Sequence, residues 1–150
     1  DNLAGSGGTD LLCYRAGEPE DLVQRQGQLW SPWLSWAEAE HGARLVTTNG
    51  IGHIAQDEAA LAALHRAVDG HDVMELAAMN DLVTIAGSLV LALAVSAGAL
   101  DVAAAWAAVR LDNEYQAERW GRDAEAEAHA AKLRGEFEIA ARFMDLHRAG

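Results

Sequence analysis

Residues 82–100, LVTIAGSLVLALAVSAGAL, decide the fold of this chain. The run contains nineteen residues without a formal charge, and Asp81 and Asp101 bound it. One helix of that length would measure about 28 Å at roughly 1.5 Å per residue, close to the roughly 30 Å hydrocarbon core of a bilayer. The run therefore allows two interpretations: a membrane span, or the buried central helix of a helical bundle.

The composition of this run favours the buried helix. Ten of its residues are small or weakly polar, so few positions supply the insertion energy of about −0.3 to −0.6 kcal/mol that Leu-like residues contribute. The nearest basic residues are Arg66 and Arg110, whereas spans usually carry Lys, Arg, Trp or Tyr near their ends. We therefore predict no stable membrane insertion and a buried helix over about 82–98, in which Gly87 and Ser88 let neighbouring helices approach closely.

The rest of the sequence predicts a mainly α, compact helical domain. Its 150 residues fit one domain, with 32 alanines and only two prolines. Residues 1–10 are polar and glycine-rich, which is typical of a flexible linker or tail, and 11–150 form the predicted helical domain. One short β element is expected near 44–55, as a strand, an Asn49-Gly50 turn and a second strand. Whether helices break near Pro32 and Asn80 stays open.

Charge and the lack of reactive motifs argue against several functions. The formal net charge of −12 makes nucleic acid a poor partner, because phosphate binding requires a basic surface. Cys13 is the single cysteine, so no internal disulfide can form. The six histidines lack the paired spacing of metal ligands, and no nucleotide-binding or nucleophile motif is recognisable. We therefore predict a protein that is not an enzyme and has no cofactor and no metal site.

Three tryptophans, Trp30, Trp33 and Trp36, lie within seven residues of one predicted helix. Tryptophan is enriched at binding hot spots, so the cluster is compatible with a partner-binding surface. Each ring buries around 150–250 Å² when it packs inside a protein, which is a large contribution to a small core. We favour the core.

A charged block, LDNEYQAERWG, occupies residues 111–121. In a continuous helix Arg110, Glu114, Glu118 and Arg122 fall four residues apart, so that Arg110 pairs with Glu114 and Glu118 with Arg122, at ~0.2–0.5 kcal/mol each. A solvated face explains these charges, but it does not explain why a glycine follows Trp120 at once. The block is the most specific feature of the sequence.

The ordered motifs around this block resemble the family of chaperones that assemble the F1 sector of ATP synthase by holding its α subunit. They run from CYRA, P-x-x-L-V-x-R-Q, W-x-P-x-L-x-W, GARL and ELAAMNDLV to GSLVLALAV and W-x-x-x-R-L-D-x-E-Y-Q-x-E-x-W-G. The resemblance covers nearly the whole chain. One local departure is Ala124, where relatives often place an acidic residue.

The resemblance implies a binding protein without catalytic chemistry. It implies that this chain is the helical domain alone, without the family's β-rich N-terminal domain, and that its partner is the F1 α subunit until the β subunit replaces it. We expect an acidic rim to orient that partner. Trp120 either packs beneath the rim, which we favour, or contacts the partner. The expected partner-binding residues are Glu114, Glu118, Trp120, Asp123 and Glu125. The expected location is the cytoplasm of a bacterium, or the mitochondrial matrix in a eukaryote, and the oligomeric state is open. A helical protein-interaction or membrane-associated domain of an unrelated pathway stays as the alternative.

Overall fold

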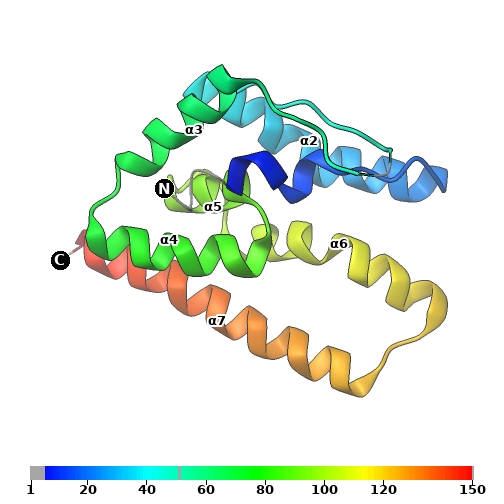
Figure 1. Cartoon of the computed structure of the whole chain (residues 1–150). Coiled ribbons are helices and arrows are strands. Elements are labelled where there is room, and N and C mark those ends of the chain that lie inside the picture. Colours follow the sequence, from blue (N-terminus) through cyan, green and yellow to red (C-terminus); the bar gives the residue numbers. More distant parts are fainter. Residues whose placement is uncertain (1–5, 51, 150) are drawn as a thin grey trace.

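The computed structural model describes residues 6–50 and 52–149, and this part of the chain is mainly helical. The predicted mainly α fold is therefore confirmed. Figure 1 shows the longer helices arranged around one short helix at the centre. In chain order the elements are two short 3-10 turns, η1 (Ser6–Thr9) and η2 (Leu11–Cys13), followed by α2 (Glu20–His41), α3 (Glu58–Asp69), α4 (Val73–Ala86), α5 (Leu89–Ser96), α6 (Val102–Trp120) and α7 (Ala124–Ala149).

The central apolar run forms two helices rather than the single one predicted over 82–98. Gly87 adopts φ of 70°, a left-handed conformation that ends α4. Ser88 then caps α5, because its hydroxyl accepts a hydrogen bond from the Leu91 N–H at 3.0 Å. The residues that were expected to ease helix packing therefore make a corner in the chain.

The shorter helix α5 is the centre of the core. All eight of its residues are buried, and it packs against α2, α4, α6 and α7 (Figure 1). A helix that is apolar on every face must be covered on every face, which explains why the run carries no charge. Within residues 6–50 and 52–149, no helix is both long enough and apolar enough to cross a membrane.

The segment before α2 is held to the core by a buried carboxylate. Asp10 is fully buried, and its two oxygens accept hydrogen bonds from the N–H groups of Leu12 at 3.0 Å and Val90 at 2.9 Å. Burial raises the pKa of Asp10, although these hydrogen bonds oppose that shift. Residues 1–5 of the predicted tail lie outside the described residues, but Asp10 belongs to the folded domain.

The predicted β element near 44–55 is reduced to one parallel bridge, between Tyr14 and Thr48. The amide of Gln56 takes the place of a second strand, because it donates to the Val46 carbonyl at 2.9 Å and accepts from the Val46 N–H at 2.8 Å. The expected pairing of 44–48 with 51–55 is therefore wrong for the described residues; Ile51 lies outside them.

The two open helix boundaries are settled in favour of continuity. Helix α2 runs through Pro32, and α4 runs through Asn80. Trp30 of α2 is fully buried, and its indole N–H donates to the Ala108 carbonyl of α6 at 2.8 Å. Trp33 and Trp36 are partly buried and pack against the same core. The predicted core role of the tryptophans is therefore confirmed.

Candidate partner-binding site

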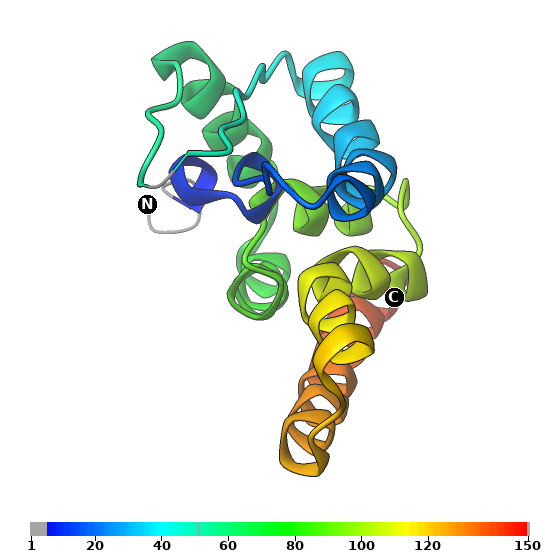
Figure 2. The same cartoon turned by 90° about the vertical axis from the view of Figure 1, so that its right-hand side faces the viewer.

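The charged block lies at the end of an arm formed by α6 and α7. Figure 2 shows the end of α6 and the start of α7 projecting away from the other helices. Gly121, with φ of 99°, ends α6. Asp123 then accepts a hydrogen bond from the Ala126 N–H at 2.9 Å, so it caps the first turn of α7. Residues 120–125 therefore form the tip of the arm.

One side of the arm is joined to α2 by a network of charged and polar side chains. Arg25 donates to both carboxylate oxygens of Glu118, at 3.2 and 2.9 Å. Asp21 accepts from the Tyr115 hydroxyl at 2.7 Å and forms an ion pair with Arg119. These hydrogen bonds, from Tyr115 first and then from Arg119, hold the pKa of Asp21 below its usual range. The network fixes the direction in which α6 leaves the core.

A second network joins the other side of α6 to α7. Arg122 pairs with Glu114, and also with Glu127 at 3.5 Å. Glu127 in turn lies 4.0 Å from Arg110. The hydrogen bond from Arg122 keeps the pKa of Glu114 below its usual value. Four charges from α6, α7 and the connection between them therefore brace the arm.

These partners differ from the predicted ladder along one helix. The pair Glu118–Arg122 does not form in the described structure, because α6 ends at Trp120 and Arg122 lies beyond it. The pair Arg110–Glu114 does not form there either: Arg110 lies nearest to Glu127, and Glu114 pairs with Arg122. Arg122 instead folds back to Glu114. The side chains that replace the predicted partners, Arg25 and Glu127, come from other helices.

The five predicted partner-binding residues fall into two groups. Glu114 and Glu118 are held in the ion pairs described above. Trp120, Asp123 and Glu125 lie exposed at the tip. Trp120 is 79% exposed, so the expectation that it packs beneath the rim is wrong. Neither Asp123 nor Glu125 forms an ion pair within the part of the chain that the structure describes.

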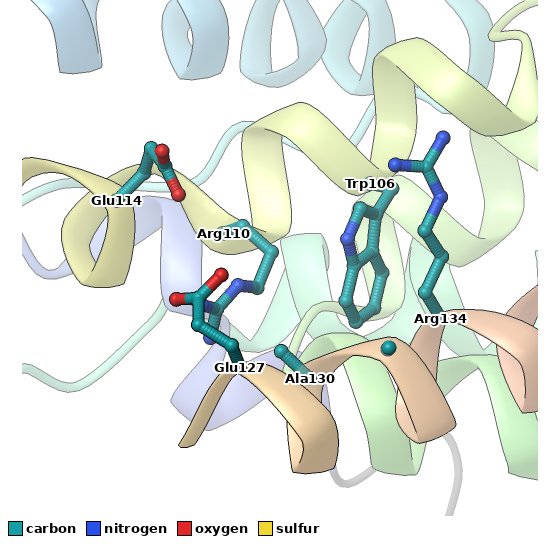
Figure 3. A pocket seen from close by; sticks show the side chains of 7 residues that line it. Trp106, Arg110, Glu114, Glu127, Ala130 and Arg134 are labelled. Atoms are coloured by element: carbon teal, nitrogen blue, oxygen red, sulfur yellow. The ribbon is translucent and has the colours of Figure 1, made fainter. Parts of the chain in front are cut away.

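Two hollows lie on either side of α6, below the tip. One, of about 250 Å³, separates α6 from α7 (Figure 3). In that view Arg110 and Glu127 point toward one another across the hollow, and Trp106 lies beside them. The other, of about 290 Å³, lies between α2 and α6 and is mostly apolar; its lining is Arg25, Leu29, Ala107, Arg110, Leu111 and Glu114. Both hollows share Arg110 and Glu114.

The arm carries both paired and unpaired charges. Glu114 and Glu118 are held in ion pairs, whereas among the described residues Asp123 and Glu125 form none and lie at the tip with the exposed ring of Trp120. Cys13, the only thiol, is buried elsewhere, and burial raises its pKa to about 12, far from that of a reactive thiolate. Among the described residues, no three His, Cys, Asp or Glu side chains are placed to hold a metal ion.

Sequence reasoning missed Asp21, Arg25 and Glu127 as parts of this region. Asp21 and Arg25 lie more than ninety residues before their partners, so local spacing gives no signal for them. Arg110 was recognised, but it was assigned to the wrong partner.

Comparison with solved structures shows what this fold is. No family model matches the chain. The crystal structure of Atp12 from Paracoccus denitrificans superposes with a TM-score of 0.93 at 46% sequence identity, over 97% of this chain and 62% of that chain. The chain is an Atp12 homologue. It therefore has the Atp12 fold and is homologous to a chaperone rather than to an enzyme.

Two further Atp12-related structures agree with this result. An aspartate-to-lysine mutant of the Paracoccus denitrificans Atp12 gives the same TM-score of 0.93 and the same 46% identity. A candidate chaperone from Agrobacterium tumefaciens has 39% identity and a TM-score of 0.88, over 95% of this chain and 53% of that one. The chain thus spans about 62% of the length of Paracoccus denitrificans Atp12. The expected resemblance to this chaperone family is confirmed.

Proposed function

We propose that this chain is the helical part of a chaperone that binds the unassembled α subunit of the F1 ATP synthase. It would keep that subunit from aggregating until the β subunit takes its place. The observation that carries the proposal is the 46% identity to Atp12 over 97% of the chain. Because the relatives are bacterial proteins, we place this activity in a bacterial cytoplasm.

Such a chaperone has to cover an exposed surface of the unassembled subunit and later release it. A subunit taken out of a ring exposes apolar surface that its neighbours normally cover, and such surface promotes aggregation. A chaperone must bind this surface strongly enough to hold it and weakly enough to be displaced by the true neighbour. Neither step requires a nucleotide or a catalytic group on the chaperone.

The tip of the arm suits the first contact with this client. Trp120 offers an exposed ring, and aromatic side chains are frequent anchors of protein interfaces. Asp123 and Glu125 add negative charge beside it, which steers association and orients the partner more than it adds affinity. Glu114 and Glu118 serve the same site by bracing the arm through Arg122 and Arg25.

Co-expression with the F1 α and β subunits tests this function. The chain should raise the soluble fraction of α when β is absent, and it should copurify with α. Adding β should release the chain from α. If α stays insoluble and does not copurify, the proposed function is wrong.

Charge variants at the tip test the role of the rim. Glu125→Lys should weaken capture of α, more at low salt than at high salt, because exposed charges are screened over about 8 Å at physiological ionic strength. Asp123→Asn removes a charge but keeps a good helix cap, so it should weaken capture without loss of stability. Glu40→Lys, at the opposite end of α2, is the matched control and should capture α normally. Equal capture by all three variants would contradict the assignment of the rim.

A further inference from the structure

A second exposed surface lies on the other half of α7, away from the tip. Ile139, Phe143 and Leu146 are spaced by four and three residues and therefore lie on one side of the helix. Ile139 is 69% exposed, Leu146 is 59% exposed and Phe143 is 38% exposed. These three side chains are called the α7 outer stripe below. Such contiguous exposed apolar side chains mark interaction sites more often than single ones do.

A hollow lies beside this stripe, where α4 and α7 pack together. Figure 1 shows the two helices lying along one another. The hollow has a volume of about 280 Å³, and its lining is Asp81, Thr84 and Ile85 from α4 with Glu136, Ile139 and Ala140 from α7. Ile139 is thus both a member of the stripe and part of the wall of the hollow. The stripe and the hollow form one continuous surface.

The charge around this surface is negative. Asp81, Glu136 and Asp145 are exposed and form no ion pair within residues 6–50 and 52–149. Two cations of α7 lie near the stripe without an ion pair in the described structure, Arg142 and Lys132, while Arg134 is paired with Glu138 at 3.2 Å. Three unpaired carboxylates therefore outnumber two unpaired cations, on a chain whose net charge is −12. This imbalance favours a basic partner and disfavours an acidic one.

The lining of the hollow, part apolar and part acidic, suits a long basic side chain. A lysine or arginine carries an apolar stem and a charged head. In the hollow the stem would lie against Ile85 and Ile139, and the head would reach the carboxylates of Asp81 and Glu136. The apolar side chains of the same partner segment would cover Phe143 and Leu146. Apolar residues at i, i+4 and i+7 are the usual way in which one amphipathic helix packs on another.

We propose that the α7 outer stripe and the adjoining hollow bind a basic, amphipathic helix of a partner protein. This surface is separate from the tip, because Ile139 follows Glu125 by fourteen residues, or roughly 20 Å along α7 at 1.5 Å per residue. It does not depend on which protein the tip binds. The arm would therefore hold a partner at two places, with acidic charge at both.

Two synthetic peptides of eighteen residues test this proposal. Both have leucines at i, i+3, i+4 and i+7; one carries lysine at the other positions and the other carries glutamate. Fluorescence anisotropy of the labelled peptides, at physiological ionic strength, gives the dissociation constants. The lysine peptide should bind and the glutamate peptide should bind at least tenfold more weakly. Equal binding, or no binding of the lysine peptide, overturns the proposal.

Substitutions that keep the net charge show whether the lysine peptide binds at this surface or is attracted non-specifically to an acidic protein. Ile139→Asn and Leu146→Asn leave the net charge unchanged and should each weaken the lysine peptide about tenfold. The double variant Asp81→Asn, Glu136→Gln should weaken it several-fold and reduce its salt dependence. Ala128→Asn, at an exposed position nearer the start of α7, is the matched control and should bind within twofold of the unmodified protein. Circular dichroism checks that every variant is folded.

Two results would contradict the proposal in these variants. Unchanged binding by Ile139→Asn and Leu146→Asn would mean that the peptide binds elsewhere. A dimer in sedimentation that Ile139→Asn converts to a monomer would mean that the stripe is covered by a second copy of the chain.

Discussion

The Tyr115 hydroxyl of α6 donates a 2.7 Å hydrogen bond to the Asp21 carboxylate in the first turn of α2. The two residues are 94 positions apart in the chain. Two guanidinium groups also lie over the ring of Tyr115: that of Arg119 is 4.4 Å from its centroid and that of Arg25 is 5.3 Å away. This contact joins the arm to the body of the molecule.

We expect Tyr115→Phe to lower the free energy of unfolding by about 1 kcal/mol, because a part-buried hydroxyl bonded to a carboxylate is lost while the buried ring stays in place. Urea denaturation followed by circular dichroism measures the change. Tyr14→Phe is the matched control, since among the described residues the Tyr14 hydroxyl bonds with His53 and the Ile54 N–H, neither of which belongs to α2 or α6. If both variants lose the same free energy of unfolding, the hydrogen bond between α2 and α6 stabilises the protein no more than the hydrogen bonds of Tyr14 do.

Two glycine substitutions should change the stability of the protein in opposite directions, one at the corner between α4 and α5 and one inside α2. Gly87→Ala should destabilise the protein by about 1–2 kcal/mol, because Gly87 has φ of 70° and an L-residue is strained there. A Cβ atom at Gly87 would meet nothing within 4 Å, so strain is the only cost. Gly27→Ala, inside α2 and equally unobstructed, should stabilise by about 0.4–1 kcal/mol. The thermal midpoint of each variant is compared with that of the unmodified protein. A lower midpoint for Gly27→Ala would contradict this reasoning.

The junction between the start of α4 and the end of α7 predicts a loss of stability in acid. The N–H of Glu75 and the ring of His147 hold the pKa of Asp72 below its ordinary 3.8, and Arg148 holds the pKa of Glu75 below its ordinary 4.5. Because both values are depressed in the folded state, the stabilisation is complete above about pH 4.5 and is lost as the pH falls through the folded-state values.

The variant Asp72→Asn, Glu75→Gln should therefore show a smaller drop in thermal midpoint between pH 5 and pH 3 than the unmodified protein. Asp101→Asn is its control, since Asp101 caps α6 and forms no ion pair in the described structure. An acid dependence unchanged by the double substitution would contradict the assignment.

Much of the fold follows from local pattern, and the exceptions have physical causes. On α7, Phe137, Ala140 and Met144 are spaced by three and four residues and are buried, which is the arrangement that a helical repeat of apolar residues favours. The division of the run 82–98 escaped prediction because Gly87 and Ser88 suit both a close helix crossing and a cap. The missing hairpin depends on Gln56, whose side chain pairs with the Val46 backbone.

The location of the binding site stays a prediction, but the structure shows where the predicted residues lie. The tryptophan and glycine of the block 111–121 form the end of α6. The ion pairs could not be predicted, since Arg25 reaches Glu118 only when α2 and α6 are packed together. The exposure of Trp120 likewise depends on how far α6 extends beyond the core.

The most direct test of the central claim is competition between this protein and the F1 β subunit for the α subunit. Unfolded α is diluted into buffer with an equal molar amount of this protein, and light scattering records aggregation before and after β is added. The account predicts that scattering is suppressed, that the two proteins elute as a complex in size-exclusion chromatography, and that β releases this protein. Scattering equal to that of α alone, with no complex, would contradict the account.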